Sequence, residues 1–135
     1  MPYEITWERR GVYRRYFGRL TDAEFIGAVV EVEGSPRFYD IRYAILDFLE
    51  MEEFVVRNES FLEETAALNF AAAMSNPNIK VAVVAVSPVV LRLAEQYKAH
   101  ALRPYTTEVF STLAEARTWV VVADPLKYRY RGALR

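Results

Sequence analysis

Three carboxylates stand close together in the segment 48–54, which reads Phe-Leu-Glu-Met-Glu-Glu-Phe. Glu50, Glu52 and Glu53 are residue types that can act as general acid or base, or bind a hard cation through their oxygens. A loop that binds such a cation also needs Asp or Asn and Gly at fixed spacing, which this segment lacks. We therefore interpret the glutamates first as a solvated loop, second as a partner contact, and last as a catalytic or metal site.

Apolar side chains are interleaved with these acids. Phe48, Leu49, Met51 and Phe54 occupy the positions beside and between the glutamates. If they are exposed, they form an apolar patch with a charged rim, which is typical of interaction surfaces. The segment is thus our candidate surface for a protein partner, or for a small apolar ligand bound between a sheet and its helices.

The remaining composition excludes much chemistry. The 135 residues include no cysteine, which excludes disulfides, thiolate nucleophiles and Cys-ligated metals. The one histidine, His100, cannot form a multi-histidine metal site, and we interpret it as a cationic residue in the last turn of a helix. We expect no catalytic residue, no metal and no cofactor.

The net charge of −1 favours neither nucleic-acid nor membrane binding. Arginines interleaved with aromatic residues near the N-terminus could stack on single-stranded nucleic acid, but we favour a hairpin that packs one set of side chains inward and leaves the other solvated. Residues 1–67 carry a net charge of −6 and residues 68–135 carry +5. This complementarity motivates the hypothesis of a homodimer.

The longest apolar run, 81–86, is too short to span a bilayer, and with no visible signal peptide we expect a cytoplasmic protein.

Hydrophobic periodicity and capping signals predict the order of the elements. Alternating or continuously apolar runs predict strands, and Ser or Thr followed by Glu three residues later, or Ser-Pro, predicts helix starts. The expected strands cover residues 3–7, 12–17, 41–48, 79–86 and 105–110, and the expected helices begin after Thr21, Ser60, Ser87 and Thr112. Strands that alternate with helices imply an open, mostly parallel α/β sheet of about five strands with four helices and an N-terminal antiparallel hairpin.

The pattern resembles the STAS and SpoIIAA-like group, the fold of anti-sigma-factor antagonists. The stretch from Gly11 to Glu24, with its Gly-Arg-Leu turn, resembles that group's second strand and first helix. Residues 44–47 (Ala-Ile-Leu-Asp) and 80–86 resemble its third and fourth strands, so the resemblance covers roughly residues 4–122. It implies a SpoIIAA-like domain over 1–124, followed by a basic tail over 125–135.

The resemblance also bears on function. Regulatory members of the group carry an Asp-Ser-Ser-Gly-like segment whose serine is phosphorylated, and here the matching stretch, 55–61, retains only Ser60. We interpret Ser60 mainly as a helix cap and only weakly as a phosphosite. The resulting hypothesis is a non-enzymatic protein-interaction or regulatory module of a bacterial cytoplasm, homodimeric and without an evident phospho-switch. Because some divergent SpoIIAA-like proteins are discussed as relatives of CRAL-TRIO lipid-binding domains, the alternative is a carrier or sensor of a small apolar ligand, and an enzyme using the three glutamates ranks last.

Overall fold

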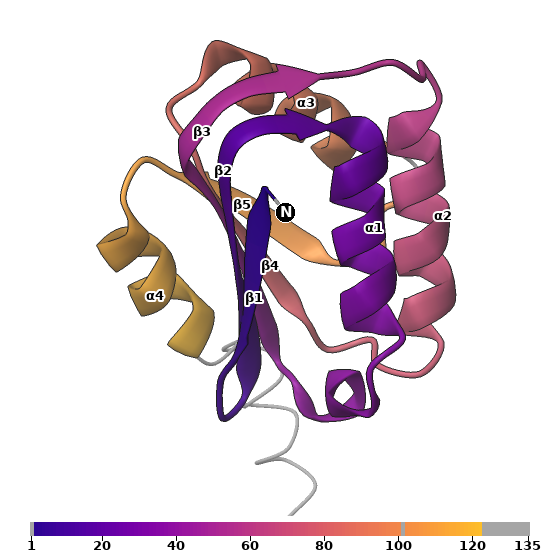
Figure 1. The fold of residues 1–135 in the computed structure, drawn as a ribbon. Coiled ribbons are helices and arrows are strands. Elements are labelled where there is room, and N and C mark those ends of the chain that lie inside the picture. Colours follow the sequence, from indigo (N-terminus) through magenta and orange to yellow (C-terminus); the bar gives the residue numbers. More distant parts are fainter. Residues whose placement is uncertain (1, 101, 123–135) are drawn as a thin grey trace, which may run out of the picture.

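A computed structural model describes residues 2–100 and 102–122 of the chain, and the predicted tail 125–135 lies outside the described residues. Four α-helices, one 3-10 helix and five strands follow one another in this range (Figure 1). In chain order they are β1 (Tyr3–Trp7), β2 (Gly11–Thr21), α1 (Asp22–Glu33), η1 (Pro36–Asp40), β3 (Tyr43–Val55), α2 (Phe61–Ala73), β4 (Lys80–Val84), α3 (Pro88–Lys98), β5 (Thr106–Phe110) and α4 (Leu113–Val121).

The strands form one sheet in the order β1-β2-β3-β4-β5. β1 and β2 pair antiparallel, whereas every other neighbouring pair is parallel. This mixed, mostly parallel sheet with an N-terminal hairpin confirms the predicted fold class.

The two faces of the sheet are covered unequally, as Figure 1 shows: α1, α2 and α3 lie on one face and α4 on the other. Strand alternation divides the apolar side chains between the two sides. Leu46 and Val83 belong to the larger core cluster under α1, whereas Ile45 and Val84 pack with Val120 of α4. Because β3 and β4 are buried on both faces, their sequences are almost continuously apolar, as predicted for central strands.

Helix starts follow the predicted capping pattern at two of three Ser/Thr–Glu sites. Thr21 accepts a hydrogen bond from the Glu24 backbone N–H (3.2 Å), and the Glu24 carboxylate accepts one from the Thr21 N–H (2.9 Å), which completes a capping box. Thr112 caps α4 through the Glu115 N–H in the same way. The prediction for Ser60 was wrong: it precedes α2, but its hydroxyl donates to Asn58 Oδ1 (2.8 Å) and caps nothing.

β2 and β3 run much further than predicted. The expected ends were residues 17 and 48, yet the strands continue to Thr21 and Val55 and curve over toward the ends of α1 and α2 (Figure 1). The pairing shifts register on both sides of Gly18, whose φ of +64° lies in the left-handed region that favours glycine. Irregularities of this kind bend a strand and increase its twist. The segment 48–54 is therefore a curved strand, and its interpretation as a loop was wrong.

Candidate functional site

The acidic side chains of segment 48–54 form ion pairs across the β2–β3 ladder. Glu50 pairs with Arg15, and Glu53 lies 3.4 Å from Arg19. Parallel register places Arg19 directly opposite Glu53, whereas Arg15 lies two residues before Phe17, the register partner of Glu50. Glu52 is exposed. The acids are thus spread along the outside of a paired strand, and exposed pairs of this kind contribute little to stability.

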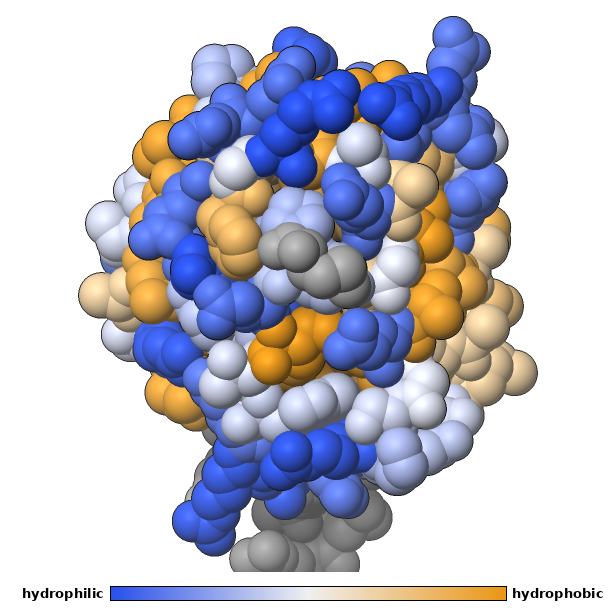
Figure 2. Space-filling model, viewed as in Figure 1, coloured by the Kyte–Doolittle hydropathy of each residue, from blue (hydrophilic) through white to orange (hydrophobic). Residues whose placement is uncertain are grey.

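The apolar members of the segment mostly face inward. Phe48 is 5% exposed, while Met51 and Phe54 are half-buried against the main core cluster. Leu49, at 41% exposure, is the one large apolar side chain of the segment on the surface. On the face shown in Figure 2, hydrophilic side chains gather over the bend of the two strands and apolar ones form separate groups. A broad apolar patch at 48–54 is therefore not present.

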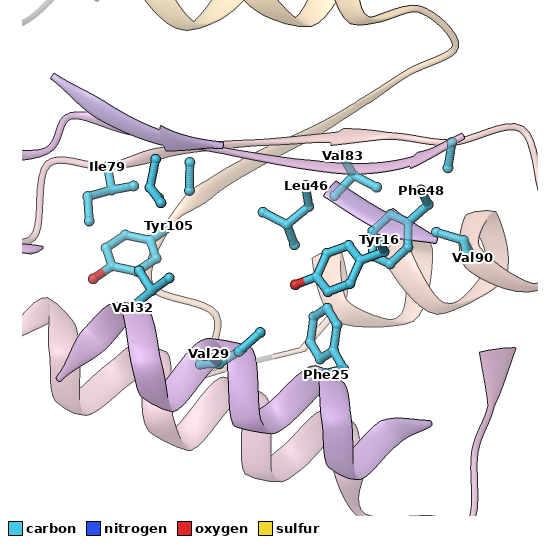
Figure 3. Close-up of a cluster of buried hydrophobic side chains, with 14 of the residues drawn as sticks. Tyr16, Phe25, Val29, Val32, Leu46, Phe48, Ile79, Val83, Val90 and Tyr105 are labelled. Carbon is cyan, nitrogen blue, oxygen red and sulfur yellow. The ribbon is translucent and has the colours of Figure 1, made fainter. Parts of the chain in front are cut away.

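Five aromatic rings from the curved strands and two helices pack together. Tyr16 stacks on Phe48 with ring centroids 4.7 Å apart, and Phe25 lies 5.6 Å from Tyr16. Phe54 and Phe61 complete the group, at 6.0 and 6.1 Å from Phe25. Figure 3 shows Tyr16, Phe25 and Phe48 converging at one end of the core, with Ile79, Val32 and Tyr105 at the other. This cluster walls off one end of the space between the sheet and the helices.

A cavity of about 100 Å³ lies in that space. Its floor is the sheet face that carries Ala44, Leu46 and Val83, and its roof is α1, with Val29 and Val32 pointing toward the sheet (Figure 3). Side walls come from α2 and α3, whose half-buried Leu62, Asn69 and Leu93 form the rim. The lining is almost entirely apolar.

Two charged side chains interrupt this apolar lining. Arg14, on β2, is 7% exposed, and its Nε is buried without a hydrogen-bond partner. Glu33, the last residue of α1, is partly buried beside the cavity. Desolvation by burial raises the pKa of the Glu33 carboxyl to about 7, although attraction to Arg14 opposes the rise. No ion pair joins them in the described part of the chain.

Three tyrosines border the same region. The Tyr97 hydroxyl accepts a hydrogen bond from Asn69, which links α3 to α2 at the rim, and Tyr105 donates to the Asn76 carbonyl (3.0 Å). The Tyr16 hydroxyl is buried without a partner. Burial raises the pKa of all three phenols, that of Tyr16 to about 12, so they are neutral near pH 7.

The opposite face of the sheet holds a second polar group. Glu8, in the β1–β2 turn, receives two hydrogen bonds from the Arg117 guanidinium of α4 (2.9 and 2.8 Å) and one from Tyr43. The hydrogen bonds from Arg117 lower the pKa of Glu8 despite its partial burial. Because these hydrogen bonds join α4 to the β1–β2 turn and to β3, we interpret the group as the structural attachment of α4.

Ser60 and His100 lie apart from the cavity lining. Ser60 is exposed, with its hydroxyl on Asn58, and its modification remains a prediction. His100 follows the end of α3 rather than occupying its last turn, and its Nδ1 accepts a hydrogen bond from the Leu102 N–H (3.2 Å).

Within residues 2–100 and 102–122, no group of three or more acidic or histidine side chains could hold a metal ion. Over the same residues, no helix combines the length and apolar character needed to cross a bilayer.

Sequence reasoning overlooked Arg14 and Glu33, although a signal for each was present. Arg14 lies two residues from both Val12 and Tyr16 on β2, so its side chain points to the same, buried face of the sheet. Glu33 follows Val29 by four residues and therefore continues the apolar side of α1. The hairpin does pack one set of side chains inward, but that set mixes arginine and tyrosine.

The strand order, the mixed pairing and the uneven helix cover define a SpoIIAA-like α/β domain. Comparison with protein-family models and with curated protein sequences finds no match, so this assignment rests on solved structures. The anti-sigma factor antagonist SpoIIAA in its unphosphorylated form is similar with a TM-score of 0.58 and 13% identity, covering 87% of this chain and 96% of the other. Phosphorylated SpoIIAA from Bacillus is similar with a TM-score of 0.57 and 16% identity, and the alignment covers 87% of this chain and 98% of the other.

A third similar structure is an uncharacterised protein of the DUF3478 family from Shewanella loihica PV-4 with a SpoIIAA-like fold. Its TM-score is 0.50 at 15% identity, and the alignment covers 87% of this chain and 91% of the other. These likenesses confirm the fold that the sequence motifs predicted. At such identities the shared feature is the fold alone.

Proposed function

We propose that the protein is a non-enzymatic binding module whose cavity takes a small apolar ligand. The observation that carries this proposal is the volume of about 100 Å³ between the apolar sheet face and α1, α2 and α3. Protein cores are normally close-packed, and an unfilled volume in a core lowers stability. An apolar cavity of about 150 Å³ can bind benzene, whereas pockets for drug-sized ligands start near roughly 300 Å³. The expected ligand is therefore a single ring or a short acyl chain.

Methyl-resolved NMR with toluene tests this function. We expect toluene to shift the methyl resonances of Val29, Leu46 and Val83, which line the cavity, and to leave Val120, on the other sheet face, unchanged. The substitution Ala44→Leu would fill the cavity from the sheet side and should remove the shifts. Equal shifts at Val120, or no shift at millimolar toluene, would rule out the cavity as a ligand site.

Protein recognition is the second candidate function, favoured by the described activity of SpoIIAA as an anti-sigma factor antagonist. Two exposed apolar side chains support it here. Leu49 and Val86 each lie two residues past Asp47 and Val84, the last positions at which β3 and β4 pair, so both follow the end of that ladder. A charged side chain, Glu50, stands beside them.

A second copy of the chain is the partner that the opposed charges of residues 1–67 and 68–135 favour. We expect size-exclusion chromatography with light scattering to show a dimer at low salt that weakens as salt screens the charges. The double variant Leu49→Glu/Val86→Glu should shift it to monomer if the end of the β3–β4 ladder takes part. A wild-type monomer at high micromolar concentration would exclude the homodimer.

The proposed module works without a phospho-switch in a bacterial cytoplasm, in keeping with the bacterial sources of the similar structures. Support for the missing switch is that residues 58–61 read Asn-Glu-Ser-Phe where the regulatory members carry an Asp-Ser-Ser-Gly-like segment. Intact-mass spectrometry of protein isolated from growing cells checks this point, and a phosphate on Ser60 would contradict it.

A further inference from the structure

Arg14 is the feature of the cavity that an apolar ligand alone does not explain. Its side chain lies among Phe25, Val29 and Leu46 at the cavity, with 7% of the residue exposed. The Nε atom is fully buried and has no hydrogen-bond partner, and no acidic side chain in the described part of the chain forms an ion pair with Arg14. An arginine almost never lies buried in this way without a partner.

The groups that face Arg14 leave its charge uncompensated. Phe25 of α1 presents its ring 5.8 Å from the guanidinium carbon, at the outer limit of a cation–π contact. Glu33, at the end of the same helix, attracts Arg14 but does not reach it. Tyr16 of β2 and Tyr97 of α3 carry neutral phenols, and the Tyr97 hydroxyl is bound by Asn69.

A buried guanidinium gains most from an anion that matches its planar donors. A carboxylate accepts two parallel N–H bonds from arginine, and charge-assisted bonds of this type are about twice as strong as neutral ones. A dianion such as a phosphate ester fits less well, because one positive charge cannot balance it and Glu33 stands nearby. The matching headgroup is a single carboxylate.

We infer that the cavity binds a small monocarboxylic acid, with its carboxylate on Arg14 and its apolar body between the sheet and α1, α2 and α3. This inference rests on the proposed function, since it requires the cavity to accept a ligand. The volume of about 100 Å³ restricts the apolar body of the acid to a short chain or at most a single ring.

Pairs of small molecules can separate the contribution of the carboxylate to binding from that of the apolar part. Benzoate and benzyl alcohol, and hexanoate and 1-hexanol, share their apolar parts and differ in the charged group. NMR titrations at pH 6, where Glu33 is mainly protonated and both acids are ionised, would follow the cavity methyls of Val29 and Val83. We expect each acid to bind about 10–100-fold more tightly than its alcohol, the range that a charged hydrogen bond in a desolvated site supplies.

The variant Arg14→Met keeps a long, flexible side chain without the charge. Replacing a buried, unpaired charge with an apolar group does not threaten folding. We expect this variant to bind the alcohols as the wild type does and to lose the preference for acids. Arg15→Met is the matched control, because it removes the same charge from the next residue, which pairs on the outer side with Glu4 and Glu50.

Each result decides a different question. Equal affinity of the wild type for acid and alcohol, or an unchanged acid preference in Arg14→Met, would overturn the assignment of Arg14 while leaving apolar binding in the cavity intact. Binding of none of the four probes and no response to toluene would overturn the proposed function and this inference together. An acid preference lost in Arg14→Met but kept in Arg15→Met supports the inference.

Discussion

Replacing Glu33 with glutamine should change how the stability of the protein depends on pH. Glu33 is the last residue of α1, where the helix dipole disfavours a negative charge, and it borders the apolar cavity. Burial raises the pKa of its carboxyl from 4.5 to about 7, with Arg14 acting in the opposite direction. The folded state therefore holds this proton over a pH range in which the unfolded chain has released it.

The sign and size of the effect follow from that difference. Between pH 4.5 and 7 the folded state binds more protons, so the free energy of unfolding falls as pH rises and levels off above the folded-state pKa. A rise from 4.5 to about 7 corresponds to at most about 3 kcal/mol. Because the side chain is partly exposed and can relax toward water, we expect roughly 1–3 kcal/mol. Glu33→Gln has no carboxyl to ionise, so its free energy of unfolding should not fall in this way. At pH 8 it should exceed that of the wild type by about 1–3 kcal/mol.

Urea unfolding of both proteins at five pH values from 4.5 to 8.5 measures the effect, with equal m-values as the check that the unfolded states are alike. Glu31→Gln is the control, since Glu31 is exposed on the same helix and the substitution changes the net charge equally. In Arg14→Met the transition should move to higher pH, because Arg14 holds the pKa of Glu33 down. A difference between Glu33→Gln and wild type that stays constant with pH would refute the reasoning.

Four further substitutions test the local structure. Thr21→Ala breaks a capping box and should lower the free energy of unfolding by about 1–2 kcal/mol, whereas Ser60→Ala should change it by less than about 0.5 kcal/mol; equal losses in urea unfolding would contradict the cap assignments. Glu8→Gln loses the bidentate contact with Arg117 and should speed hydrogen exchange across α4, with a loss of roughly 1 kcal/mol or less; unchanged exchange there would contradict its role. Asp22→Ala should cost about 2–4 kcal/mol in thermal or urea unfolding, because three backbone N–H groups lose their acceptor; a loss below about 1 kcal/mol would show that water replaces it.

The order of the elements could be predicted because its signals are local. The Thr21 and Thr112 caps mark helix starts with a side chain and a backbone group a few residues apart. The run 81–85 is apolar because α4 covers one of its faces and the other helices cover the second. The extension of β3 through 48–54 could not be predicted in the same way. Its glutamates have low strand propensity, and the segment is a strand because β2 provides hydrogen-bond partners and the arginines 15 and 19.

The cavity was outside the reach of sequence patterns for a different reason. Its lining comes from all four parallel strands and three helices, and the fit of those side chains is a property of packing in three dimensions. The inward position of two lining residues could be predicted from the sequence. Arg14 alternates with buried residues of β2, and Glu33 continues the apolar side of α1 at helical spacing. A charged residue at a position that a pattern assigns to the core is the signal that should have been followed.

The curved extension of β2 and β3 connects the failed loop prediction to the proposed site. A loop ending the strands at residues 17 and 48 would have left Phe54 and Met51 free to form the exposed patch. The bend at Gly18 instead carries Phe54 over to Phe25 and Phe61, so the aromatic cluster closes one end of the space beneath α1. Arg14 is buried in this cavity, and burial is what makes its unpaired charge costly and strongly attractive to an anion. The same backbone irregularity that turns Phe54 inward thus helps to build the buried site.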